Sequence, residues 1–158
     1  MRFRFLRPGD VKLYHKDVYM PEELLAQAKQ LIRTVDATSP YSISRHVYES
    51  LTGKTEGWSH QLNYVPFVRA FNNIKKDIDL DIFEIETTND VVTKCVARTS
   101  YSHIYDISFV IRRGIIVTAW KNRKGDAHYT LDISKYEKDP DEYFSEEDFA
   151  DDLEFVEE

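Results

Sequence analysis

Cysteine is almost absent from this sequence, which has Cys95 and no other. A single cysteine excludes a disulfide within the chain and any metal site built from several cysteines. Glycine-rich phosphate loops, His-x-x-x-His pairs and Gly-x-Ser-x-Gly elbows are also missing. These absences argue against nucleotide hydrolysis, zinc chemistry and serine-hydrolase chemistry. We therefore expect no metal and no cofactor.

Long apolar runs are missing as well. No stretch approaches the ~20 apolar residues that a membrane-spanning helix needs. The first ten residues, MRFRFLRPGD, lack the continuous apolar core of a secretion signal. The single cysteine fits a reducing compartment. Together these features predict a cytoplasmic protein without membrane contact.

Charge is distributed unevenly along the chain, whose formal net charge is −7. Residues 137–158 hold 12 acidic residues and one lysine, a net charge of −11. The preceding residues hold 16 acidic and 20 basic residues, a net charge of +4. A basic body with an acidic tail is typical of nucleic-acid contact that the tail regulates, or of a tail that only improves solubility. We expect this tail to be disordered or to pack only through its scattered aromatic residues.

The order of helical and extended patterns predicts an α+β fold. With 158 residues, 42% of them hydrophobic, the chain is long enough for one core. We predict a single domain over residues 1–136, in which helices from 21–76 cover one face of an antiparallel sheet of four or more strands from 79–136. The predicted helices are 21–36, 42–51 and 65–76; the predicted strands are 79–87, 91–101 and a hairpin over 107–120, with shorter extended pieces at 2–6 and 11–14.

The register of the hairpin decides where Thr118 points. A two-residue turn at 113–114 pairs Thr118 with Phe109 and places it in the core. A three-residue turn at 112–114 pairs Thr118 with Ser108 and separates the two faces better, so we predict the second register. The apolar face would then hold Ile107, Phe109, Ile111, Ile115, Val117 and Ala119.

The side chains that remain for chemistry are histidine, threonine, arginine, lysine, tyrosine and aspartate. This set can cleave RNA without a metal. A base takes the proton of a ribose 2′-hydroxyl, cationic and hydroxyl donors stabilise the phosphorane, and an acid protonates the leaving 5′-oxygen. The polar loop that begins at Lys121 and leads to His128 follows directly on the hairpin, which is a good scaffold for such groups.

The end of this region resembles a known family. Bacterial endoribonuclease toxin domains close on a strand reading V-T-A-W or similar, followed by Asn, Asp, His, Thr-Leu and Tyr. They belong to the superfamily that groups barnase, EndoU, colicin nucleases and RelE-type toxins. The likeness covers residues 92–136 and, more loosely, 42–90. It rests on Ile116-Val117-Thr118-Ala119-Trp120, Asn122, Asp126, His128, Thr130-Leu131-Asp132 and Tyr136, with Ser44-Arg45-His46 and Val96-Ala97-Arg98 upstream.

The resemblance implies a sheet packed on helices, with RNA, tRNA being one candidate, on the exposed concave face of the sheet. It also implies roles for individual residues. His128 would be the general acid or base with His46 as its partner, Thr118 and Tyr136 would donate to phosphate, and Arg98 would stabilise charge. The substrate-binding set would be Lys121, Asn122, Arg123, Lys124 and Trp120, the three cations holding backbone phosphates.

The acidic tail departs from the family, whose toxin domains are strongly basic. This keeps a second interpretation open, a non-catalytic bacterial or phage interaction protein whose residues 137–158 bind a basic partner or imitate nucleic acid. A third combines the two: the tail covers the basic loop and inhibits RNA binding.

Overall fold

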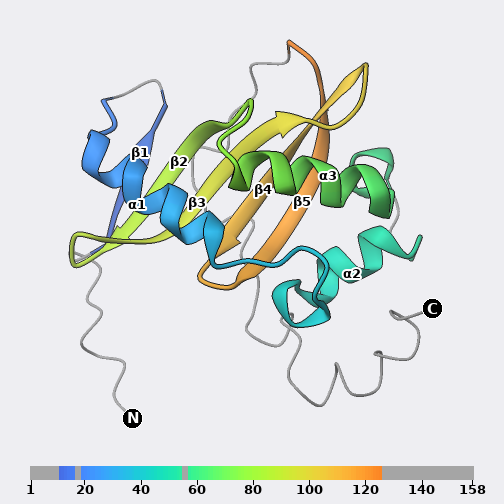
Figure 1. The fold of residues 1–158 in the computed structure, drawn as a ribbon, viewed down its shortest axis with the longest axis horizontal. Coiled ribbons are helices and arrows are strands. Elements are labelled where there is room, and N and C mark those ends of the chain that lie inside the picture. Colours follow the sequence, from blue (N-terminus) through green and yellow to red (C-terminus); the bar gives the residue numbers. More distant parts are fainter. Residues whose placement is uncertain (1–10, 17–18, 55–56, 126–158) are drawn as a thin grey trace.

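The computed structural model describes residues 11–16, 19–54 and 57–125, and the fold is that of these ranges. Three α-helices pack on a five-stranded antiparallel sheet (Figure 1). The elements, in chain order with the short 3-10 turns written η, are β1 (Val11–His15), α1 (Glu22–Arg33), η2 (Pro40–Ser42), α2 (Arg45–Leu51), η3 (Trp58–His60), α3 (Tyr64–Lys75), β2 (Asp81–Thr88), β3 (Val91–Ser100), β4 (Tyr105–Arg112) and β5 (Ile115–Arg123).

Local sequence explains where helix α1 begins and ends, and the structure shortens the helix predicted after it. Helix α1 follows Pro21, carries Glu22 and Glu23 in its first turn and has Arg33 in its last, so its charges complement the helix dipole. The Oγ1 hydroxyl of Thr34 donates to the carbonyl of Leu31 at 2.7 Å, and the helix ends there rather than at the predicted residue 36. The predicted helix 42–51 is shorter in the structure, because its first residues belong to η2 and an extended link.

The sheet is a meander in the order β1-β2-β3-β4-β5, each strand antiparallel to its neighbours. Asn89 and Asp90, both with positive φ, form the two-residue turn from β2 to β3. Strand β1 pairs with β2 and adds a fifth strand to the four that follow the helices. The prediction of an α+β fold with helices on one face of an antiparallel sheet is therefore confirmed.

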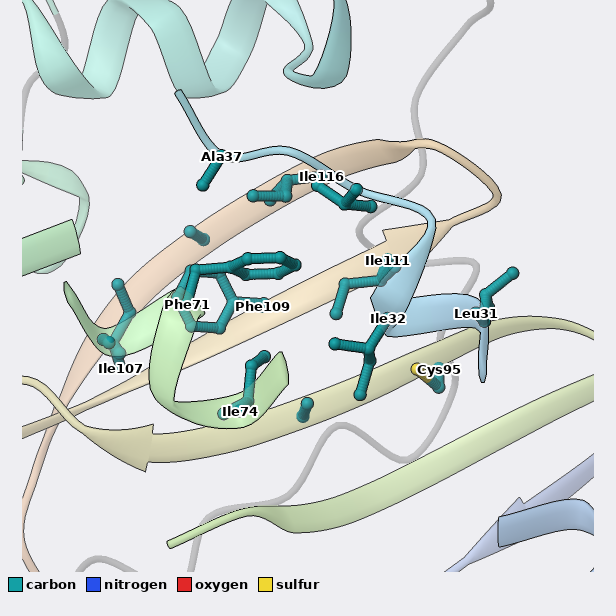
Figure 2. Close-up of a cluster of buried hydrophobic side chains, with 14 of the residues drawn as sticks. Leu31, Ile32, Ala37, Phe71, Ile74, Cys95, Ile107, Phe109, Ile111 and Ile116 are labelled. Carbon is teal, nitrogen blue, oxygen red and sulfur yellow. The ribbon is translucent and has the colours of Figure 1, made fainter. Parts of the chain in front are cut away.

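The main core lies between this sheet and helices α1 and α3 (Figure 2). Phe109 of β4 is at its centre, fully buried, with the rings of Phe67 and Phe71 from α3 edge-on at 5.6 and 5.2 Å. Such aromatic contacts stabilise by about 0.5–1.5 kcal/mol beyond the burial of their area. Strand β4 is thereby held in one position against the helices, and with it the polar residues on its other side.

The predicted hairpin register is wrong. Arg112 pairs with Ile115, so the turn has two residues, and its Gly114 has a φ of 76°. Strand β5 then has a bulge after Ile116, beyond which Thr118 pairs with Val110. A bulge reverses the side-chain alternation that follows it. Of the predicted apolar face, Ile107, Phe109, Ile111 and Ala119 lie in the main core, joined by Ile116, whereas Ile115 and Val117 do not.

A second, smaller apolar cluster lies on the opposite side of the sheet, which we call the second face. It contains no residue of the described helices. Its buried members are Phe83, Val96, Val110, Val117 and Trp120, with Leu13 and Ile115 packed against them. The second face is also where the polar residues of β3, β4 and β5 meet.

Candidate functional site

Three charged side chains converge on the second face near the end of β5, and we call them the charge cluster: Arg98, Asp106 and Lys124. The guanidinium Nε of Arg98 lies 3.3 Å from one carboxylate oxygen of Asp106. The ammonium of Lys124 lies 3.6 Å from the other. One carboxylate thus bridges two cations, one from β3 and one from the residue that follows β5. The cluster is an arrangement that can hold a single anionic group.

Arg98 is the most enclosed member of the charge cluster. Its side chain is 6% exposed, it stacks over the ring of Phe83 at 5.3 Å, and its NH2 group donates to the carbonyl of Arg123 at 3.3 Å. The cation is therefore held from three sides, by a carboxylate, a ring and a carbonyl. A guanidinium fixed in this way offers its remaining donors to a ligand in a defined direction.

Polar neighbours extend the charge cluster across the strands. Arg98 pairs with Ser108, and Ser108 pairs with Trp120, so these three side chains form a row across β3, β4 and β5. The Ser108 hydroxyl donates to Asn122 Oδ1 at 2.9 Å. Thr118 belongs to the same strand as Trp120 but pairs with Val110 and is buried. Trp120 is 8% exposed, because it belongs to the second apolar cluster.

A histidine pair lies at the outer edge of β5. The rings of His46 from α2 and His60 from η3 are edge-on, 5.0 Å between centroids. His60 Nδ1 lies 3.2 Å from the carbonyl oxygen of Ala119. Since a carbonyl only accepts, Nδ1 is the donor in this hydrogen bond, and Nε2 is the acceptor nitrogen of the neutral ring. No local sequence pattern relates the two histidines; they meet because α2 and η3 both pack against the edge strand β5.

Strand β5 is anchored at this edge by the chain before α2. Ser44 caps α2 by accepting from the Val47 N–H at 3.2 Å, and its hydroxyl donates to the Val117 carbonyl at 2.6 Å. Its own N–H donates to the Ile116 carbonyl at 3.1 Å. These bonds satisfy two carbonyl groups of the edge strand β5 beside its bulge. They also fix the position of the start of α2, and with it His46, relative to the strand.

An aromatic–lysine site lies at the same end of the sheet, on the side of the helices; it consists of Trp58, Tyr101, Tyr105 and Lys121. The Lys121 ammonium is 5.3 Å from the Tyr105 ring, 5.6 Å from Trp58 and 6.0 Å from Tyr101. Burial lowers the pKa of Lys121. The rings of Trp58 and Tyr105 are 5.3 Å apart. Three aromatic faces thus hold one cation, an arrangement that stabilises the cation through the ring quadrupoles.

The residues predicted from the sequence fall into three places. Arg98, Asn122, Lys124 and Trp120 share the second face with Thr118, whereas Lys121 and Arg123 pair with residues of the helix-covered side, and His46 lies at the β5 edge. His128 and Tyr136 lie outside the described residues. The structure therefore groups part of the predicted set and separates Lys121 and Arg123 from it.

Asp106, Trp58 and His60 are not among the residues predicted from the sequence. Asp106 carried a usable signal, because it alternates with Ser108 at the start of a strand whose residues from Phe109 to Ile111 are all apolar. Trp58 also carried a signal, because it stands among glycine and polar residues in a predicted loop. A large aromatic ring is unusual in such a polar segment and marks it for attention. We find no sequence signal for His60.

A hollow beside α2 has a different character. Its volume is about 120 Å³, and no charged residue lines it. The lining residues of the hollow are Ala37, Thr38, Ser39, Pro40, Ile43, Tyr48, Leu51, Thr52 and Tyr64.

Two other kinds of site are absent from the described residues. No group of three or more metal-ligating side chains comes together there. In the same part of the chain, no helix is long and apolar enough to cross a membrane.

Comparison with known proteins adds no relative: the chain matches no protein-family model, no curated protein and no solved structure.

Proposed function

We propose that this chain is a metal-independent endoribonuclease of the toxin type, which cleaves RNA by attack of a 2′-hydroxyl on the adjacent phosphate. The observation that carries the proposal is the convergence of Arg98 and Lys124 on one carboxylate, that of Asp106. A substrate phosphate carries the same charge as this carboxylate and accepts hydrogen bonds from the same donors. In this proposal Asp106 occupies the position of the phosphate and is displaced by it.

The chemistry of the neighbouring residues suits this reaction. The fixed guanidinium of Arg98 stabilises the additional negative charge of the phosphorane, because a preorganised cation needs no rearrangement when that charge develops. Ser108 and Asn122 supply hydroxyl and amide groups beside it. His128 is the proposed acid or base, with His46 as its partner, and Thr118 and Tyr136 are the proposed phosphate donors.

Substrate positioning is assigned to the cations and polar groups at the end of β5. Lys121, Arg123 and Lys124 hold backbone phosphates, which fix position without reading sequence. Asn122 and Trp120 complete the proposed substrate-binding set. Lys124 also donates to the Ser100 hydroxyl at 2.7 Å, so its ammonium stays near the strand end. RNA, with tRNA as one candidate, is the proposed substrate, and the cytoplasm the proposed location.

The test is cleavage of total RNA, and separately of tRNA, in the presence of EDTA. We expect products that end in a 2′,3′-cyclic phosphate. These 3′ ends should resist both ligation and phosphatase until mild acid opens the cyclic diester to a monoester, which a phosphatase then removes. His128→Ala should lower the rate by about 100-fold to 10,000-fold, the usual contribution of a general acid or base. Arg98→Met, which keeps the aliphatic stem, should lower it by about 100-fold to 1,000-fold.

His103 provides the matched control. It is an exposed histidine in the connection between β3 and β4, so His103→Ala should leave the rate unchanged. Circular dichroism of each variant separates lost chemistry from lost folding. Folded wild-type protein that cleaves neither RNA preparation would contradict the proposal.

A non-catalytic interaction protein is the second candidate. The observation that favours it is the burial of Arg98, Thr118 and Trp120, which a face open to RNA would expose. In this proposal residues 137–158, with their net charge of −11, bind a basic protein partner or an inhibitor protein, or imitate nucleic acid. Deletion of residues 137–158 should then abolish partner binding, and His128→Ala should not change it.

A further inference from the structure

Trp58 presents a large exposed ring at the edge of the sheet. The residue is 49% exposed and opens η3, which packs on β5. Its ring is tilted by 36° to that of Tyr105, at a centroid distance of 5.3 Å. One part of the indole is thereby supported by the protein and another part faces solvent. A supported, exposed indole is a surface on which a flat apolar group can stack.

The Lys121 ammonium next to this indole has no carboxylate partner among the described residues, and it lies against three aromatic rings. Aromatic faces stabilise a cation without neutralising its charge. The positive charge therefore stays available to an anion. The exposed Arg123 lies two residues further along the same side of β5 and adds a second cation.

These two features define the chemistry of the ligand. A cationic ligand is unsuitable, because the Lys121 ammonium beside these rings would repel it. An acidic peptide would satisfy the cations but would leave the indole without a stacking partner. A nucleotide has both a flat base and an adjacent phosphate, and so it matches both features.

We propose that the aromatic–lysine site binds one unstacked nucleotide of single-stranded RNA, with the base on Trp58 and its phosphate on Lys121 and Arg123. The inference rests on the proposed function for the identity of the polymer, and it adds a base-binding subsite separate from the charge cluster. Single-stranded RNA is required because a base inside a duplex is stacked between its neighbours and has no free face to offer. Trp120, which the resemblance places in the substrate-binding set, is buried and offers no exposed ring, so the base is assigned to Trp58.

The experiment measures binding without cleavage. A fluorescein-labelled 2′-O-methyl oligoribonucleotide of about eight residues, the scale of a small single-strand site, lacks the attacking hydroxyl and is titrated with the full-length protein. Binding is followed by anisotropy. The same sequence in a duplex is the second probe. In a Trp120→Phe background, Trp58 is the only tryptophan, and its fluorescence reports stacking directly.

Trp58→Ala should weaken binding of the single strand by about 5-fold to 150-fold, the range for loss of one base–aromatic stack. Tyr19→Ala is the matched control, because Tyr19 is also an exposed ring, 77%, but lies before α1. Lys121→Met should reduce the slope of log affinity against log salt by about 0.7, the contribution of one phosphate contact on a single strand. Lys12→Met, on β1 at the opposite edge of the sheet, should leave the slope unchanged.

The outcomes separate this inference from the proposed function. Weaker binding by Trp58→Ala, with quenching of Trp58 by the single strand and not by the duplex, supports the subsite whether or not the protein cleaves RNA. No binding, equal loss in Tyr19→Ala, or equal affinity for the duplex overturns it. Cleavage that depends on Arg98 but binding that ignores Trp58 would overturn the subsite and leave the nuclease proposal standing.

Discussion

Replacing Asp106 with asparagine removes one charge from the charge cluster and hardly changes its shape. The variant leaves the guanidinium of Arg98, whose side chain is 6% exposed, facing a neutral amide. Breaking a fully buried ion pair by removing one partner costs about 3–5 kcal/mol. Asp106 is 24% exposed, so water screens part of the interaction. We therefore expect a loss of about 2 kcal/mol in the free energy of unfolding.

Asp77→Asn is the matched control. Asp77 pairs with Lys29 at 2.9 Å, but the two side chains are 46% and 37% exposed, and such pairs contribute about 0–1 kcal/mol. Asp77 has a φ of 60°, a conformation that asparagine also tolerates, so the substitution adds no backbone strain. Any loss in this control should vanish at high salt, because an exposed pair is screened.

Urea denaturation followed by circular dichroism measures both variants. With a slope of about 2 kcal/mol/M, a loss of 2 kcal/mol moves the midpoint by about 1 M. Asp106→Asn in an Arg98→Met background should cost less than Asp106→Asn alone, since no buried cation is left without its partner. The reasoning is refuted if Asp106→Asn lies within about 0.5 kcal/mol of wild type, or if it is no more costly than Asp77→Asn.

Three further predictions concern a buried thiol, a turn and the tail. Burial raises the pKa of the Cys95 thiol to about 12, so it should react with a disulfide reagent only after unfolding. The free energy of unfolding of wild type, minus that of Cys95→Ala, should be constant below about pH 9. Above this pH the difference should fall by up to about 1.4 kcal/mol per pH unit, because only the unfolded thiol ionises there. A difference in urea midpoint that stays constant above pH 9 would contradict the burial. Gly114→Ala should cost about 1–2 kcal/mol in urea denaturation, because the φ of Gly114 is 76°; an unchanged midpoint would mean that the turn rearranges. Deletion of residues 137–158 should raise affinity for RNA in filter binding at low salt and progressively less at high salt; equal affinity at all salt concentrations would exclude inhibition by the tail.

The sequence predicted the helices and strands better than it predicted which side of the sheet each strand residue lies on. Helix α3 was expected at 65–76 and spans Tyr64–Lys75, because a proline in the first turn and an apolar stripe are local signals. The bulge in β5 was not expected. It lies where Ser44 bonds to the Ile116 and Val117 carbonyls, so the contacts beside it come from a segment far away in the chain. The side of the sheet on which Val117 lies therefore depended on tertiary structure.

For the candidate sites too, the sequence shows some features and only the tertiary structure decides the others. The cations of the β5 end and the polar alternation of β4 are visible in the sequence, because strand periodicity is a local property. Which carboxylate binds Arg98, which ring meets Lys121 and which histidine meets His46 depend on how the strands and the short η3 turn are placed relative to one another. Composition and periodicity alone determined an α+β protein with a basic body and an acidic tail. Only the folded sheet decided which of its charges and rings lie together, because those contacts join residues that no local pattern relates.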